Sequence, residues 1–324
     1  MQVLVAIYSP NDVWTIPSSH VDLLRCRFPG VVFSHAEDEA DLMRLLPDAD
    51  VAFTSVLTPQ AFELASRLRW VHSSAAGVGS MLFPAMLASP VVMTNSRGMS
   101  AASVAEHAVA LMLAALRRLP ETIRAQDGRR WIQTELSGLP TLDGQTLGIV
   151  GLGAIGGRVA RIGAAIGMKV VGTRRETDWP VPDGVAEALA PSDLPRLLGA
   201  SDIVVLSAPL TAETRGLIGA PELARMKRTA WLVNVARGKL VQEAALIDAL
   251  RSGRIAGAAL DVFEHEPLDP ASPLWAMPNV IVTPHVAGFR GDYWEAATDL
   301  FSDNLRRFLA GQPLLNLVDK RAGY

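Results

Sequence analysis

The stretch that most constrains how this chain can fold is TLGIVGLGAIG, residues 146–156. It begins as a short apolar run rich in β-branched residues, which is typical of a buried parallel strand. The pattern G-x-G-x-x-G follows at once, and a helix-like stretch continues to residue 165. Such a strand–turn–helix suits a dinucleotide, because its glycines let the backbone approach a pyrophosphate and the helix N-terminus presents free N–H groups.

Three spaced glycines alone are a weak signal, since they also allow plain packing of a helix on a strand. The context favours a cofactor site, because a second apolar strand, residues 169–172, closes a βαβ unit. Further strands are expected at 202–206, 230–235, 257–261 and 279–283, and a helix at 242–251. This half of the chain is therefore predicted to be one doubly wound parallel sheet.

Composition limits the remaining classes of function. The chain has 324 residues, 49% of them hydrophobic, which is enough for two domains. A net charge of −3 argues against a nucleic-acid or anionic-membrane partner. The single cysteine, Cys26, excludes an intramolecular disulfide and indicates a reducing compartment. The start MQVLVAIYSP is expected to be a strand, not a signal peptide, and no apolar run is long enough to span a membrane, so we expect a soluble cytoplasmic protein.

The first hundred residues alternate strand and helix signals, which predicts a second parallel α/β sheet. We expect strands at 3–7, 31–33, 51–53 and 70–72, and helices at 36–46 and 59–67. The stretch WVHSSAAGVG, residues 70–79, ends a strand in a loop of small residues. This loop is either a plain tight turn or a source of backbone N–H groups for an anionic substrate.

Residues 100–119 are predicted to form a helix that is apolar nearly all round, capped by Ser100 and stopped by Pro120. A helix without a polar face must be buried in the protein or against a partner. Glu106 and His107 interrupt its apolar surface, and we interpret them as satisfied polar groups at a packed interface, with a catalytic role as the alternative. A second helix, residues 293–310, is amphipathic and is expected to pack onto the first domain.

Chemical groups gather where the strands of the glycine-containing half end. Arg237, Glu266 and His285 each follow a predicted strand, and ligands of open parallel sheets bind at that edge. Reduction of a 2-oxo acid needs a cation for the carboxylate, and arginine holds one with a bidentate fork. It also needs a proton donor for the oxygen, and a histidine kept charged by a neighbouring carboxylate supplies one. Alone, each residue could be an ordinary surface or loop group, and the cluster at 264–266 could suggest a metal site, but no further ligands stand at a recognised metal spacing.

Several runs carry a resemblance to a known family. LVNVARGKLV at 232–241, GAALDVFEHEPL at 257–268, SPLWAMPNVIVTPHVAG at 272–288 and APLTAETRGLI at 208–218 resemble the D-isomer-specific 2-hydroxyacid dehydrogenases, and VAEHAVALMLAALRRLP at 104–120 matches their long linking helix. The resemblance implies two Rossmann-like doubly wound domains, with the cofactor domain inserted into a discontinuous substrate domain. It implies a substrate-binding domain of 1–99 plus 287–324 and a dinucleotide-binding domain of 100–286, with 100–119 as linking helix and homodimer core.

The resemblance also implies roles for single residues. Arg237, Glu266 and His285 would be catalytic, with Arg237 also holding the substrate carboxylate, and Ala76, Gly77 and Val78 would form the substrate-carboxylate loop. Asp261 would lie near the nicotinamide carboxamide. Together with the glycine fingerprint, the resemblance predicts cofactor contacts from Gly151, Leu152, Gly153, Ala154, Ile155, Gly156, Thr173, Arg174, Arg175, Ala208, Pro209, Val235, Ala236, Asp261, His285 and Gly288.

The chain departs from the family pattern at two places. The family often has histidine at the position of Ser207, and its NAD-using members carry an acidic residue where this chain has Arg174. That position lies 174 − 156 = 18 residues beyond the last glycine, where a carboxylate normally holds the ribose 2′-hydroxyl. Thr173, Arg174 and Arg175 could instead bind a 2′-phosphate, so we expect NADP(H) to be preferred, with NAD(H) as the second candidate; a solvated basic loop is the alternative.

Within the family, the short chain and this basic loop resemble the glyoxylate/hydroxypyruvate reductases. The absence of a C-terminal regulatory domain counts against many phosphoglycerate dehydrogenases, although one lacking that domain stays an alternative. A second alternative is a cofactor-sensing, protein-binding module of the corepressor type, which shares the fold and keeps a catalytic set. The sequence does not identify the 2-oxo acid.

Overall fold

A computed structural model describes residues 1–10 and 12–323 of the chain. The chain divides into two compact units, Met1–Ser100 with Arg290–Tyr324, and Ala101–Phe289. The first unit is therefore assembled from both ends of the chain, and the second is an uninterrupted segment. Both contain a parallel sheet, which confirms the predicted α/β class with two doubly wound domains.

The first unit contains a five-stranded parallel sheet in the order β2-β1-β3-β4-β5. Its strands are β1 Gln2–Ala6, β2 Val32–His35, β3 Val51–Thr54, β4 Trp70–Ser73 and β5 Val92–Asn95. The four strands predicted here are confirmed within two residues, while β5 is an additional strand. Strands β3 and β4 are buried along their whole length, as is typical of parallel strands covered on both faces, and they include the buried polar residues Thr54, His72 and Ser73.

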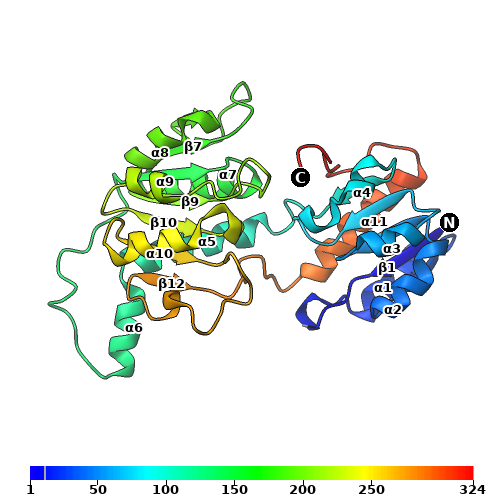
Figure 1. Ribbon diagram of the computed structural model, residues 1–324, viewed down its shortest axis with the longest axis horizontal. Coiled ribbons are helices and arrows are strands. Elements are labelled where there is room, and N and C mark those ends of the chain that lie inside the picture. The colour runs from blue at the N-terminus through cyan, green and yellow to red at the C-terminus, as the bar shows by residue number, and fades with distance from the viewer. Residues whose placement is uncertain (11, 324) are drawn as a thin grey trace. The chain divides into compact units, whose positions relative to one another are not determined.

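Helices cover both faces of this sheet (Figure 1). Alternate strand residues point to opposite sides, so Val3, Val5 and Phe53 pack with α1 and α11, whereas Leu4 and Ala52 pack with α2, α3 and α4. The helices are α1 Ser18–Arg27, α2 Glu39–Leu45, α3 Pro59–Leu64, α4 Pro84–Ala88 and α11 Tyr293–Leu309. The predicted packing of the 293–310 helix onto the first domain is confirmed, since Phe301 and Leu305 are fully buried in that core.

The second unit contains a seven-stranded parallel sheet in the order β12-β11-β10-β9-β6-β7-β8. Its strands are β6 Thr146–Val150, β7 Lys169–Thr173, β8 Glu187–Leu189, β9 Ile203–Leu206, β10 Trp231–Asn234, β11 Gly257–Leu260 and β12 Val280–Val282. Six of them are predicted strands with ends shifted by at most one residue, and β8 is an addition. The chain order reverses between β6 and β9, which makes that edge the switch point where ligands of such sheets bind.

Two helical layers enclose the sheet. Helices α5 and α7 pack on one face, and α8, α9 and α10 pack on the other (Figure 1). Their bounds are α5 Ala101–Leu116, α7 Ala154–Ala165, α8 Leu194–Ala200, α9 Ala220–Arg225 and α10 Glu243–Arg251. The helix predicted at 242–251 is therefore confirmed.

The predicted helix 100–119 is wrong at its C-terminal end. Helix α5 stops at Leu116, Arg118 adopts a positive φ of 51°, and a new helix, α6 Leu119–Asp127, begins with Pro120 in its first turn. Proline fits there because the first helical N–H groups have no intrahelical partner, so Pro120 starts a helix and does not stop one. Helix α6 and the segment after it extend away from the sheet of their unit (Figure 1). No helix in residues 1–10 and 12–323 is long and apolar enough to cross a membrane.

Candidate active site

The glycine fingerprint forms a tight turn between β6 and α7. Gly151 has a φ of 102°, and a Cβ atom there would lie 2.7 Å from the Ala208 nitrogen. A Cβ at Gly156 would lie 2.2 Å from the Gly151 oxygen, so the helix packs on the turn with no room for a side chain. At Gly153, the N-cap of α7, a Cβ would meet nothing within 4 Å. The turn is therefore closed by two glycines and open at the third, as a pyrophosphate at the helix N-terminus requires.

Ser207 ties this turn to the neighbouring strand end. It follows β9, and its hydroxyl donates to the Gly151 carbonyl oxygen at 2.8 Å. The Cβ that Gly156 lacks would also lie 2.9 Å from this hydroxyl. At the position where the family often has histidine, this chain thus has a small group that braces the glycine turn from the switch-point side.

The basic group at the end of β7 is already in contact with its own loop. The Arg174 guanidinium donates to the Pro180 carbonyl at 3.0 Å and also to the Trp179 carbonyl. Its Nε is the one buried side-chain nitrogen or oxygen in the described chain that has no hydrogen-bond partner. Thr173 is buried, and its carbonyl accepts from the N–H groups of Gly151 and Leu152, while Arg175 is exposed.

Arg237 is placed by the turn that follows β10. The buried Asn234 side chain accepts from the Ala236 N–H at 3.1 Å and donates to the Arg237 carbonyl at 3.0 Å, which shapes the turn. Gly238 follows, and a Cβ there would lie 1.8 Å from the Phe263 carbonyl carbon. The missing side chain lets the strand-end loops of β10 and β11 touch. Sequence reasoning did not single out Asn234 or Gly238, although an asparagine ending a strand is a recognisable turn signal.

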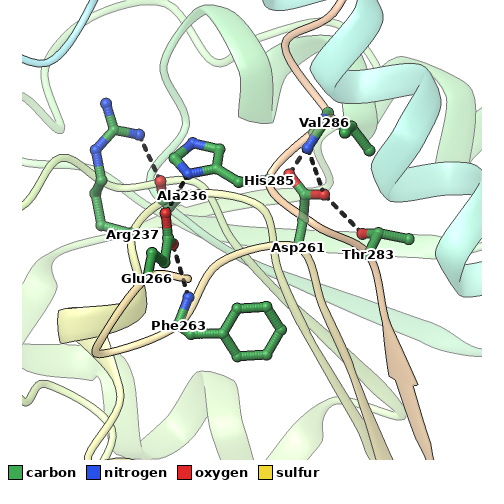
Figure 2. A network of polar contacts seen from close by, with 9 residues as sticks. Ala236, Arg237, Asp261, Phe263, Glu266, Thr283, His285 and Val286 are labelled. Atoms are coloured by element: carbon green, nitrogen blue, oxygen red, sulfur yellow. Dashed lines mark hydrogen bonds and ion pairs between the residues drawn. The ribbon is translucent and has the colours of Figure 1, made fainter. Parts of the chain in front are cut away.

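Glu266 and His285 form the polar pair beside Arg237 (Figure 2). The His285 Nδ1 lies 2.6 Å from the Glu266 Oε2, and the other carboxylate oxygen accepts from the Phe263 N–H at 2.9 Å. The His285 Nε2 has no hydrogen-bond partner among the described residues. Arg237 donates to the Ala236 carbonyl at 2.6 Å, and its remaining N–H groups find no acceptor within residues 1–10 and 12–323. The cluster therefore presents one free imidazole nitrogen beside a free guanidinium edge.

The electrostatics follow from this geometry. Burial alone would raise the pKa of Glu266, but the hydrogen bonds from His285 and Phe263, with the charges of His285 and Arg237, lower it overall. Burial lowers the pKa of the Arg237 guanidinium, and the charge of Glu266 acts in the opposite direction. Glu266 is thus an ionised carboxylate near neutral pH.

A second, buried network holds the turn that carries His285. The Asp261 carboxylate accepts from the Thr283 hydroxyl at 2.6 Å and from the N–H groups of Val286 and Ala287 at 3.0 Å each (Figure 2). His107 of α5 reaches the Thr283 hydroxyl at 3.0 Å and the Asp261 carboxylate at 3.4 Å. Burial alone would raise the pKa of Asp261, but the hydrogen bonds from His107, Thr283, Ala287 and Val286 lower it overall.

This network explains the backbone at His285, whose φ of 54° lies in the left-handed region. A non-glycine residue there costs free energy, so surrounding contacts must hold it. The His285 N–H donates to the Asp261 carbonyl at 2.8 Å, and the next two N–H groups donate to the Asp261 carboxylate. The interpretation of His107 as a satisfied polar group agrees with these contacts. Glu106 differs, because it lies on the exposed side of α5.

The remaining predicted contacts are scattered over the same sheet edge. Val235 and Ala236 are buried, Ala208 and Gly288 are half-buried, and Pro209 is exposed. No three histidine, cysteine, aspartate or glutamate side chains in the described residues are grouped to hold a metal ion.

The predicted substrate loop lies in the first unit, directly after β4. Ala76 and Gly77 are exposed, whereas the Val78 side chain is buried and anchors the loop. The N–H groups of these three residues donate to no acceptor in the described chain. The structure therefore places Arg237, Glu266 and His285 together in the second unit, and the loop in the first.

Comparison with known proteins gives a consistent family. The model of the D-isomer specific 2-hydroxyacid dehydrogenase NAD-binding domain matches residues 109–287. The glyoxylate reductase of Korarchaeum cryptofilum is 37% identical over 297 residues, which cover 90% of this chain and 86% of that one. The D-3-phosphoglycerate dehydrogenase of Methanocaldococcus jannaschii is 34% identical over 285 residues, but the chain spans only 53% of its length.

Solved structures agree. A D-isomer specific 2-hydroxyacid dehydrogenase from Xanthobacter autotrophicus Py2, in complex with NADPH and MES, is 35% identical with a TM-score of 0.86, covering 100% of this chain and 99% of that one. An NADPH-dependent glyoxylate/hydroxypyruvate reductase from Sinorhizobium meliloti, in complex with NADP and sulfate, is 32% identical with a TM-score of 0.85 and the same coverage. These matches confirm the resemblance that the sequence motifs carry.

Proposed function

The chain belongs to the D-isomer-specific 2-hydroxyacid dehydrogenases, and on this premise we propose that it transfers a hydride from NADPH to a small 2-oxo acid, giving a D-2-hydroxy acid. The substrate would be of the glyoxylate or hydroxypyruvate type, as in the reductases named above. The observation that carries the proposal is the cluster of Arg237, Glu266 and His285, with a free imidazole nitrogen beside a free guanidinium edge.

His285 is the proton donor in this proposal. Its Nδ1 is engaged by Glu266, so the ring is fixed and Nε2 is the nitrogen that can give a proton to the carbonyl oxygen. The ionised Glu266 carboxylate holds the imidazole ring through the contact at 2.6 Å. Arg237 holds the substrate carboxylate, for which its planar fork is suited. Bound nicotinamide supplies the hydride.

The loop Ala76–Gly77–Val78 contributes backbone N–H groups to the same anionic substrate in this proposal. Successive backbone N–H groups without internal acceptors favour an anion. The assignment of the predicted domain of residues 1–99 plus 287–324 to substrate binding rests on this loop, and that of residues 100–286 to the cofactor rests on the glycine turn. The first unit of the structure, Met1–Ser100 with Arg290–Tyr324, carries this loop.

NADP(H) is the cofactor that the residues fit best. The glycine turn offers an open helix N-terminus for the pyrophosphate, and β7 ends at Thr173 and leads into Arg174 and Arg175, with an arginine at the position where a carboxylate normally holds the ribose 2′-hydroxyl. The two related structures described above hold NADPH or NADP. NAD(H) is the second candidate, since the matching family model is an NAD-binding domain. Asp261 holds the turn that carries His285, and we place it near the nicotinamide carboxamide.

Phosphoglycerate oxidation is the second candidate activity, because the Methanocaldococcus jannaschii relative carries that name. The corepressor type of function, with cofactor sensing and no turnover, is the contrasting class.

One assay separates these readings. NADPH absorbance at saturating cofactor should fall when glyoxylate or hydroxypyruvate is added, and the His285→Ala variant should lose ~10²–10⁴-fold in kcat, the usual contribution of a general acid. The variant should keep the urea unfolding midpoint of the unmodified protein, which controls for folding. Absence of turnover with every 2-oxo acid, despite tight NADPH binding, would favour the cofactor-sensing module. Oxidation of 3-phosphoglycerate that is faster than reduction of glyoxylate or hydroxypyruvate would favour the phosphoglycerate dehydrogenase.

A further inference from the structure

The backbone carbonyl groups at the start of the loop after β4 all accept hydrogen bonds. Each of four successive backbone oxygens, from Ser73 to Ala76, accepts one hydrogen bond from a residue outside the loop. The donors are the Ser96 hydroxyl to Ser73 at 2.9 Å, the Tyr293 hydroxyl to Ser74 at 3.0 Å, the Ser96 N–H to Ala75 at 3.2 Å and the Asn95 amide to Ala76 at 2.7 Å.

The backbone N–H groups of the loop are only partly paired. The Ser74 N–H donates to the Thr54 carbonyl, and the Ala75 N–H donates to the Ser73 hydroxyl. The N–H groups of Ala76, Gly77 and Val78 have no acceptor in the described residues. Because the carbonyls are tied back and these donors are not, the exposed end of the loop presents partial positive charge.

These donors to the loop carbonyls act as clamps, and Tyr293 is the one among them that belongs to the C-terminal helix α11. It is the first residue of α11, and its ring packs edge-on to Trp14 at 5.4 Å and to Trp294 at 5.0 Å between centroids. Burial raises the pKa of Tyr293 to about 12, so the hydroxyl stays a donor across any assay range. Three residues earlier, Arg290 donates to the Met99 carbonyl at 2.7 Å and fixes the start of the segment.

We propose that Tyr293 is a positioning residue for substrate binding: by holding the Ser74 carbonyl, its hydroxyl aims the N–H groups of Gly77 and Val78 at the substrate carboxylate. The inference rests on the proposed function, since it takes the substrate to be a 2-oxo acid. It adds a residue that touches neither substrate nor cofactor and that acts through the loop.

Tyr293 is also the clamp that can be removed most cleanly. Asn95 and Ser96 each serve several hydrogen bonds, Asn95 with the Asn316 backbone and side chain among them, so their loss would disturb the sheet edge itself. Tyr293→Phe removes only the hydroxyl and leaves the aromatic packing in place.

The kinetic test compares Tyr293→Phe with Tyr8→Phe. Tyr8 lies in the same unit, and its hydroxyl has no hydrogen-bond partner among the described residues, which makes it a matched control. With saturating NADPH, we expect Tyr293→Phe to raise the KM for the 2-oxo acid by ~3–10-fold, the effect of one hydrogen bond. Both kcat and the Kd for NADPH should stay within twofold, because the reacting groups lie in the other unit. A KM equal to that of Tyr8→Phe, or a parallel loss of NADPH binding, would overturn the proposal.

A second readout does not depend on turnover. Oxalate, added to the NADPH-bound protein, should shift the backbone amide signals of Gly77 and Val78 in a TROSY spectrum, and its Kd should rise in Tyr293→Phe by the same factor as KM. Unshifted Gly77 and Val78 signals in the unmodified protein would overturn the positioning role, whatever the activity. Shifted signals and a weakened Kd in a protein that reduces no 2-oxo acid would support the role while contradicting the proposed function.

Discussion

At the scale of single residues, the site depends on groups whose partners are settled by strand-end loops. One oxygen of the Glu266 carboxylate accepts from the Phe263 N–H, and the other contacts His285. Both oxygens are therefore held by protein groups. Arg174 is the contrasting case. Its guanidinium is engaged by the carbonyls of Trp179 and Pro180, so a 2′-phosphate would have to replace those contacts.

We expect Arg174→Asp to abolish or reverse a preference for NADPH. A charge-assisted hydrogen bond contributes ~1.5–3 kcal/mol, so the ratio of kcat/KM for NADPH to that for NADH should fall by roughly 10–100-fold. Arg161→Asp, on an exposed position of α7, makes the same charge change away from β7 and should leave the ratio near its original value. The preference of the unmodified enzyme should also shrink with added salt if the contact is exposed. An unchanged ratio in Arg174→Asp would assign the phosphate to other groups.

At the scale of elements, Asp261 at the end of β11 supports the turn after β12. It holds two backbone N–H groups next to His285, a left-handed residue that would otherwise relax. His107 extends the network to α5, so three elements of the second unit fix the turn that carries the proton donor.

We expect Asp261→Asn to destabilise the fold by about 1–3 kcal/mol at neutral pH, because an amide nitrogen would face a buried N–H donor. The pKa of Asp261 is lowered in the folded state, so its stabilisation is complete above its unfolded pKa and is lost as pH falls through the lower folded value. Urea unfolding at pH 7 and at about pH 3 should therefore show the gap between the two proteins narrowing with acid. Asp178→Asn, on an exposed loop, is the control. A gap that is constant with pH would contradict the ionised network.

The sequence predicts most elements because parallel strands buried on both faces are apolar runs that stand out in the chain, as in β6 and β9. Strand β8 escaped prediction because it is three residues long and only its last residue, Leu189, is buried. The assignment of Pro120 as a helix stop is wrong because a proline can follow the end of one helix or lie in the first turn of the next. The left-handed turn at Arg118 shows that Pro120 begins a helix here. The three chemical groups were found at strand ends, whereas the support from Asp261, Thr283 and His107 depends on tertiary contacts that no local pattern encodes.

At the scale of the whole molecule, the oligomeric state depends on which apolar surface is left uncovered. Nine of the sixteen residues of α5 are buried, so its apolar faces need less cover than the sequence suggested. One exposed apolar side chain, Leu113 at 39% exposure, lies in α5, and three more follow that helix, Leu119 at 45%, Ile123 at 56% and Trp131 at 90%. Exposed large apolar side chains are typical of an interaction surface where they gather in one patch.

We propose that this surface pairs with that of a second copy, since two-fold dimers are the commonest oligomers. Sedimentation at micromolar concentration should give twice the 34.7 kDa of one chain. Ile123→Asp should shift the species towards the monomer, and Leu87→Asp, at an exposed position of α4 in the first unit, should not. A stable monomer of the unmodified protein would contradict the proposal.

The proposed reaction itself makes one prediction that joins cofactor, substrate and stereochemistry. Hydroxypyruvate should be consumed with one NADPH oxidised per molecule, and chiral analysis of the product should give D-glycerate, because the family to which the chain belongs is specific for the D isomer. The measurement needs only a limiting amount of NADPH and the unmodified protein. L-glycerate, a racemic product, or no oxidation of NADPH by any small 2-oxo acid would contradict the account.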